Sequence, residues 1–259
     1  MKIVIKVGTS TLSHPTGLLN IRHMEMLCKV MSDLKNQGHR LILVSSGAIG
    51  MGVGKLSLGA RPADTETKQA AAAVGQCELM YTYDKLFSEY RHIVAQLLLT
   101  GKDILDPSHR ENFQKTVERL LSLGVLPIIN ENDTVAVDEI MFGDNDTLAA
   151  YVAEAIGADL LILLSDIDGL FSADPHTDPS AELIPVVREL NEDIRRNAGG
   201  SGSELGTGGM TTKIRAAQIV TNAGIDMIIT NGSCPENLYK IVEGENVGTR
   251  FLGKGKNEK

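Results

Sequence analysis

Short runs of apolar residues recur along the chain, and small or polar residues follow most of them. The runs lie at residues 3–7, 41–44, 93–100, 126–129, 160–164 and 227–229. Runs that are apolar at consecutive positions, rather than at every second one, are typical of strands covered on both faces, as in parallel sheets. The pattern therefore predicts a mostly parallel sheet buried between other layers.

Segments with helical periodicity separate these runs. They lie at residues 20–37, 65–89, 110–123 and 211–223. The first begins at Asn20, a good N-terminal cap, and Gly38 closes it. Strands that alternate with helices predict βαβ units with right-handed crossovers, and hence an α/β fold.

The polar residues that follow the strands predict a ligand site. Five runs end in Gly8-Thr9-Ser10, Ser45-Ser46-Gly47, Asn130-Glu131-Asn132-Asp133, Ser165-Asp166 and Thr230-Asn231-Gly232. Any single loop after a strand is commonly polar and rich in glycine. Five such loops should meet at the carboxyl edge of a parallel sheet, where α/β proteins bind ligands, and this favours a binding site.

Composition narrows the class of partner. The chain has 259 residues, of which 42% are hydrophobic, and a net charge of −8. An acidic surface argues against nucleic acid or an anionic membrane as the main partner, but it permits a small anion in a local basic pocket. No apolar run approaches the roughly 20 residues of a membrane helix. The start, MKIVIKVGTS, is typical of a first strand and not of a signal peptide.

Cysteine and histidine spacing predicts no metal site. Cys28, Cys77 and Cys234 form no C-x-x-C motif, and the six histidines are scattered. Reduced thiols of this kind are typical of a cytoplasmic protein.

The glycine-rich segment GTGGMTTK, at residues 206–213, has the composition of a phosphate-binding loop. It is not a Walker A loop, because Lys213 follows Thr212 and precedes Ile214. It predicts a helix start whose N–H groups and positive dipole end face phosphate oxygens. The preceding residues 196–206 are expected to be mobile, and the tail 253–259 to be disordered.

Seven motifs together resemble the amino acid kinase family, and in particular its members that phosphorylate free glutamate. They are KVGTS, VSSGAIGMG, KQAAAAVGQ, NENDTV, GDNDTLAA, SDIDGLFSADP and GTGGMTTK, in this order along residues 2–252. The resemblance implies a three-layer α/β/α sandwich in one domain, residues 1–252, with the acceptor in the N-terminal part and the nucleotide in the C-terminal part. It also implies that ATP phosphorylates the side-chain carboxylate of glutamate, giving an acyl phosphate on the way to proline.

The resemblance carries candidate residues for each role. The catalytic candidates are Lys6, Lys213 and Asp146. The acceptor candidates are Ser46, Gly47, Ala48, Asp133 and Asn145. The ATP candidates are Lys6, Gly8, Ser165, Asp166, Thr207, Gly208, Gly209, Met210, Thr211, Thr212 and Lys213. Magnesium is expected to be held mainly by phosphates and water.

Physical chemistry supports several of these roles, although each of these residues could also have an ordinary structural role. Acceptor and triphosphate are both anionic, so the site needs cations such as Lys6 and Lys213, although Lys6 could be a solvated lysine at a strand end. Asp146 between two lysines would hold both in place; alternatively it caps the following helix, a role that Asp144 could also fill. Asp133 is a carboxylate in a pocket for anions, which is explained if it binds the α-ammonium of the substrate. Alternatively, it is an ordinary turn residue.

Two alternatives remain open from the sequence. The chain could be another family enzyme, acting on acetylglutamate, aspartate, carbamate or uridylate, or a non-catalytic sensor of amino acids. Ser165 departs from the threonine usual in the family. Many members carry an additional RNA-associated PUA domain that has no counterpart in these residues, so we expect either a naturally short form or a truncation. The resemblance further implies a homo-oligomer and inhibition by proline.

Overall fold

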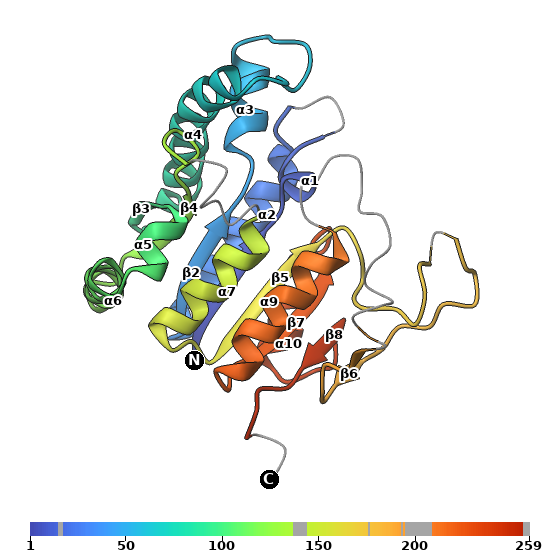
Figure 1. The fold of residues 1–259 in the computed structure, drawn as a ribbon. Helices are drawn as coiled ribbons and strands as arrows, with labels where there is room; N and C mark the ends of the chain where they lie inside the picture. Colours follow the sequence, from blue (N-terminus) through green and yellow to red (C-terminus); the bar gives the residue numbers. More distant parts are fainter. Residues whose placement is uncertain (15–17, 137–143, 176, 193, 195–208, 256–259) are drawn as a thin grey trace.

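The computed structural model describes residues 1–14, 18–136, 144–175, 177–192, 194 and 209–255. Its centre is one eight-stranded sheet with helices on both faces (Figure 1). The strand order is β3-β4-β2-β1-β5-β7-β8-β6. Neighbouring strands from β3 to β7 in this order are parallel, β8 is antiparallel to β7, and β6 is parallel to β8. The prediction of a mostly parallel α/β sandwich is confirmed.

All apolar runs are strands, each within two residues of its predicted ends. The strands are β1 Lys2–Val7, β2 Arg40–Ser45, β3 Val94–Leu99, β4 Leu126–Glu131, β5 Leu160–Ser165, β6 Val186–Val187, β7 Asp226–Asn231 and β8 Thr249–Phe251. The sequence pattern missed β6 and β8, because strands of two and three residues are too short to show a period.

The long predicted helices are also present. The described helices are α1 Thr9–Leu12, α2 Ile21–Asn36, α3 Ala48–Lys55, α4 Thr65–Ser88, α5 Gly101–Leu105, α6 Pro107–Ser122, α7 Asn145–Ile156, α9 Met210–Asn222 and α10 Asn237–Val242. Asn20 caps α2 as predicted by accepting a hydrogen bond from the backbone of His23. The predicted start of α6 at residue 110 is wrong, because Asp106 caps the helix and Pro107 opens it.

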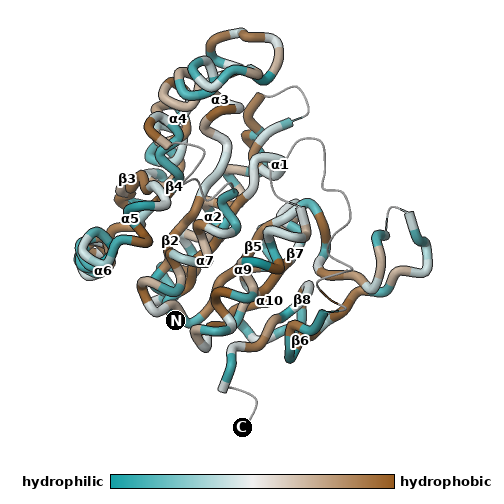
Figure 2. The backbone as a smooth tube through the Cα atoms, viewed as in Figure 1, coloured by the Kyte–Doolittle hydropathy of each residue, from teal (hydrophilic) through white to brown (hydrophobic). Residues whose placement is uncertain are grey.

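Two apolar cores lie on opposite faces of the sheet. One packs α5, α6, α7 and α9 against residues such as Val4 and Ile42, and the other packs α2, α4 and α10 against Ile3 and Leu41. Figure 2 shows the hydrophobic β2 between helices whose outer positions, as on α6, are hydrophilic. Consecutive residues of a strand thus pack against helices on opposite faces of the sheet. Because both faces are buried, positions on both are apolar, which explains the continuous apolar runs.

The carboxyl ends of the parallel strands meet at one edge. The last paired residues are Val7 and Ser45 for β1 and β2, Val7 and Leu164 for β1 and β5, and Ser165 and Asn231 for β5 and β7. These strands thus end at nearly the same level. The polar loops that follow these strands therefore share that edge, as predicted. Within the described residues, no helix is long and apolar enough to span a membrane. The segment 196–206 and the end of the tail, 256–259, lie outside the described residues.

Candidate active site

A buried cluster of one carboxylate and two ammonium groups lies at the carboxyl edge. Lys6 Nζ is 2.6 Å from Asp146 Oδ1, and Lys213 Nζ is 3.1 Å from Asp146 Oδ2. Thr212 Oγ1 lies 2.9 Å from Asp146 Oδ2. The three charged residues come from β1, α7 and α9, and at most 8% of the surface of any of them is exposed. Lys6 is therefore not a solvated lysine at a strand end.

The two lysines control the charge of Asp146. Burial by itself would raise the pKa of this carboxyl, but the ion pairs with Lys6 and Lys213 outweigh burial and lower the pKa below its usual range. The carboxylate is thus ionised at neutral pH, and the cluster carries a net charge of about +1. Buried charge is expensive, so an excess cation here is typical of a site that receives an anion.

Asp144, rather than Asp146, caps α7. Its carboxylate accepts hydrogen bonds from the backbone N–H and the hydroxyl of Thr147, at 2.7 and 2.9 Å. Asp146 is therefore free to pair with the lysines, which decides between the two roles that the sequence left open.

Four of the predicted acceptor residues, Ser46, Gly47, Ala48 and Asn145, lie together beside this cluster. Ser46 directly follows β2, Gly47 has a left-handed φ of 105°, and Ala48 begins α3. Asn145 Nδ2 donates to Ser46 Oγ at 2.8 Å and to Asn130 Oδ1 at 3.0 Å. Since Asn145 and Asp146 are consecutive, the start of α7 joins these residues to the lysine cluster. We call Ser46, Gly47 and Ala48 the acceptor turn.

The sequence did not assign a role to Asn130 or Gln76, although both belong to recognised motifs. Asn130 is the first residue of NENDTV and Gln76 the last of KQAAAAVGQ. The buried Asn130 Nδ2 donates to Gln76 Oε1 at 2.9 Å. Their side chains meet only in the fold, because 54 positions separate them.

Asp133 lies in the loop after β4 and is half-buried. Burial raises the pKa of its carboxyl, and the nearby positive charge of Arg61 opposes this rise. Because burial disfavours the charged form of this carboxyl, a cationic ligand beside it would stabilise that form. The predicted contact with the α-ammonium of the substrate would supply such a cation.

The predicted nucleotide residues flank the cluster on its other side. Ser165 ends β5 and its hydroxyl lies 3.1 Å from Asp166 Oδ1. A Cβ atom on Gly8 would lie 3.5 Å from Lys6 Nζ, so the chain after β1 passes close to the cluster.

The start of α9 holds the other predicted nucleotide residues. Gly209 precedes the helix without a side-chain cap, and Met210, Thr211 and Thr212 form its first turn. Thr207 and Gly208 lie outside the described residues. Among the described residues, no group of three or more histidine, cysteine, aspartate or glutamate side chains could hold a metal ion.

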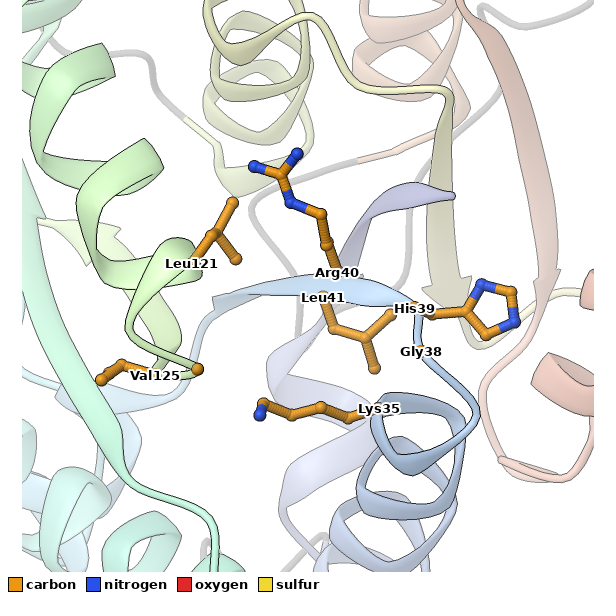
Figure 3. A pocket seen from close by; sticks show the side chains of 8 residues that line it. Lys35, Gly38, His39, Arg40, Leu41, Leu121 and Val125 are labelled. Atoms are coloured by element: carbon orange, nitrogen blue, oxygen red, sulfur yellow. The ribbon is translucent and has the colours of Figure 1, made fainter.

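A small cavity lies at the opposite end of the strands. Figure 3 shows Lys35, His39 and Arg40 around the start of β2. Its volume is about 110 Å³, and it is lined by Lys35, Gly38, His39, Arg40, Leu41, Leu121, Gly124 and Val125. The helices α2 and α6 end here, and each has a basic residue in its last turn, Lys35 and Arg119, where it complements the helix dipole. None of the predicted site residues lines this cavity.

Comparison with known proteins decides the family. The sequence profile of the amino acid kinase family matches residues 1–231. The chain belongs to the amino acid kinase family. Among amino acid kinases, the glutamate 5-kinase of Clostridium acetobutylicum is 55% identical over 255 residues, which cover 98% of this chain and 96% of the relative. The glutamate 5-kinase of Carboxydothermus hydrogenoformans is 52% identical and covers 99% of this chain, but the match covers 69% of that relative.

Solved structures agree on the fold of this amino acid kinase. The carbamate kinase from Giardia lamblia, bound to AMP-PNP, superimposes with a TM-score of 0.71 at 15% identity. The match covers 97% of this chain and 98% of that chain. At this identity the likeness establishes the fold alone.

Proposed function

We propose that the protein acts as a glutamate 5-kinase. It transfers the γ-phosphoryl group of ATP to the side-chain carboxylate of free L-glutamate, which yields ADP and L-glutamyl 5-phosphate. This is the first step of proline biosynthesis. The two glutamate 5-kinases that are 55% and 52% identical over nearly the whole chain support this activity.

The cluster of Lys6, Asp146 and Lys213 is the observation that carries the mechanism. Phosphoryl transfer needs little covalent chemistry from a protein, but it needs positioning and stabilisation of charge. The two ammonium groups meet the charge that develops on the transferring group and on the leaving ADP. Asp146 holds both in place through its two oxygens, 2.6 and 3.1 Å away, so little reorganisation accompanies the reaction.

The acceptor turn binds glutamate in this proposal. The Ser46 hydroxyl and the N–H groups of Gly47 and Ala48 face a carboxylate, and Asn145 adds a neutral donor. Asp133 binds the α-ammonium. A second carboxylate in an anion pocket would otherwise repel both substrates, so this role explains why it is present.

ATP lies over Gly8, Ser165, Asp166 and the segment from Thr207 to Lys213. The backbone N–H groups at the start of α9 face the phosphates, because Gly209 has no side chain that would cap them. Magnesium accompanies the nucleotide and adds neutralising charge. The only carboxylate of the cluster, Asp146, already pairs with a lysine through each of its two oxygens. We therefore expect the metal to be held mainly by phosphates and water.

Proline, the final product of the pathway, is the proposed feedback inhibitor. It offers a carboxylate and an ammonium much as glutamate does, so it should compete for the acceptor turn. We further propose that the enzyme is a homo-oligomer, as the resemblance implies, and that it is cytoplasmic, as the spacing of its cysteines suggests.

Other acceptors give the competing functions. Acetylglutamate has no charged amine to pair with Asp133, and a non-catalytic sensor would have no need of all three residues of the charged cluster. Aspartate, carbamate and uridylate are the other acceptors that members of the family use.

One assay tests the function directly. The protein is incubated with ATP, Mg²⁺ and each acceptor, the release of ADP is followed, and for the carboxylate acceptors hydroxylamine traps the acyl phosphate as a hydroxamate. We expect hydroxamate with glutamate and at most a few per cent of that rate with N-acetylglutamate or aspartate. A higher rate with another acceptor, or ATP binding without turnover, would replace the proposal by one of the competing functions.

A further inference from the structure

The acceptor turn rests on α4. The turn continues into α3, whose main packing partner is α4, and Figure 1 places α3 beside α4, beyond the carboxyl edge of the sheet. Lys55, at the end of α3, also pairs with Glu78 of α4. Strand β1 holds the near side of the turn, since Ser46 N donates to the carbonyl of Val7, the last residue of β1, at 3.1 Å. The far side therefore takes its position from α4.

The backbones of α3 and α4 touch without side chains between them. Ala48 and Gly52 of α3, and Ala71 and Gly75 of α4, have the same spacing of four, which places each pair on one helix face. A Cβ atom on Gly75 would overlap the Ala48 carbonyl oxygen and lie 2.8 Å from its carbon. A Cβ atom on Gly52 would lie 2.9 Å from Ala71 Cα. Gly75 thus contacts the acceptor turn itself, through Ala48.

The next residue of α4 reaches the other side of the acceptor site. Asn130 Oδ1 accepts from the backbone N–H of Glu131 at 2.9 Å, so its Nδ2 must point to Gln76. That orientation leaves Oδ1 to accept from Asn145 at 3.0 Å. Gln76, 9% exposed, accepts a hydrogen bond from the amide nitrogen of Asn130 and so, together with the Glu131 N–H, holds Asn130 in this orientation. Asn130 lies within a chain of amides that ends on Asn145 and Ser46.

We propose that Gly75 and Gln76 are positioning residues for the acceptor: Gly75 sets the position of Ala48 by direct backbone contact, and Gln76 orients Asn145 through Asn130. Neither residue touches the acceptor. The inference rests on the proposed function, because it assumes that glutamate binds at the acceptor turn.

The first test compares two glycine substitutions. Gly75→Ala must push α3 away from α4, whereas Gly50→Ala, in α3 itself, meets its nearest atom at an ordinary 3.7 Å. We expect Gly75→Ala to raise the KM for glutamate about ten-fold or more, because small misplacements of a substrate-binding group are costly. The KM for ATP should stay within about two-fold, and Gly50→Ala should leave both KM values within about two-fold.

The second test serves if Gly75→Ala does not fold. Gln76→Met keeps the length of the side chain but removes the acceptor for Asn130, and it should raise the KM for glutamate roughly five-fold or more. Gln37→Met, the same change at an exposed position of the α2 end, should have no effect. Thermal unfolding checks that the variants are folded at the assay temperature.

The outcomes separate the two proposals. Absence of glutamate-dependent turnover in the wild type overturns the proposed function and this inference with it. Wild-type turnover combined with an unchanged KM for glutamate in folded Gly75→Ala or in Gln76→Met overturns the positioning role alone. Equal increases in the KM for ATP would also overturn it, since they indicate a general structural defect.

Discussion

At the scale of single residues, the site depends on one buried carboxylate between two lysines. The identities of Lys6, Asp146 and Lys213 could be predicted from motifs in the sequence. Their contacts could not, because the residues are separated by 140 and 67 positions, from 6 to 146 and from 146 to 213. Which aspartate caps α7 was equally open, since Asp144 and Asp146 both stand near the predicted helix start.

The lysines should be essential for turnover. Lys6→Met or Lys213→Met removes a cation matched to charge on the transferring phosphoryl group, and we expect kcat to fall about 100-fold or more. Lys115→Met is the control, because this exposed lysine of α6 pairs only at the surface with Glu111. Near-normal kcat in both cluster variants would exclude the charge role.

Asp133 should determine the affinity for the α-ammonium. Asp133→Asn keeps the shape but loses a charge-assisted hydrogen bond, which is worth roughly 1.5–3 kcal/mol and corresponds to a rise in the KM for glutamate of about ten- to a hundred-fold. The KM for ATP should barely change, and discrimination against N-acetylglutamate should weaken. An unchanged KM for glutamate would contradict this placement.

The pH dependence of kcat/KM for glutamate should report the same residue. Burial raises the pKa of Asp133, so on acidification this carboxylate takes up its proton at a higher pH than an ordinary aspartate would. Because kcat/KM reflects the free enzyme, it should begin to fall at that higher pH. Asp133→Asn should abolish this early fall, and a profile identical in both proteins would assign the titration to another group.

At the scale of elements, the start of α7 joins the two halves of the site. Asn145 faces the acceptor turn, Asp146 faces the lysines, and Asp144 caps the helix that carries both. The long helices were predictable from period and caps. The short α1, α5 and α10 were not predicted, because four to six residues complete little more than one turn.

Removing the α7 cap should affect both stability and turnover. Asp144→Ala should cost about 1 kcal/mol of unfolding free energy and also lower kcat, because the helix start carries Asp146. Asp106→Ala, which removes the α6 cap, should cost a similar amount but leave kcat unchanged. Denaturant unfolding and the hydroxamate assay measure the two effects. Equal kcat in both variants would show that the cap does not position Asp146.

At the scale of the whole molecule, one sheet separates two apolar cores and contributes side chains to both. Leu161 of β5 packs in the core with α7 and α9, and the next residue, Ile162, packs in the core with α2 and α4. A single central strand therefore couples both helical layers.

This coupling predicts a single unfolding transition. Leu161→Ala and Ile162→Ala should each cost about 2–5 kcal/mol, because both side chains are fully buried. The loss should lower the denaturant midpoint of one shared transition, followed by circular dichroism and by loss of ATP-dependent activity. Two separate transitions in either variant would mean that the layers fold independently, against the predicted single domain.

The sequence by itself determined the fold class, the family and the chemical types at the site. Period, caps and motif order are local properties, so they can be read from neighbouring residues. Only the tertiary structure decided the pairing of Asp146 with both lysines, the capping role of Asp144 and the contacts of Gly75 and Gln76. These contacts join residues far apart in the chain, and their geometry follows from the register of the strands and the crossing of the helices, which no local pattern encodes.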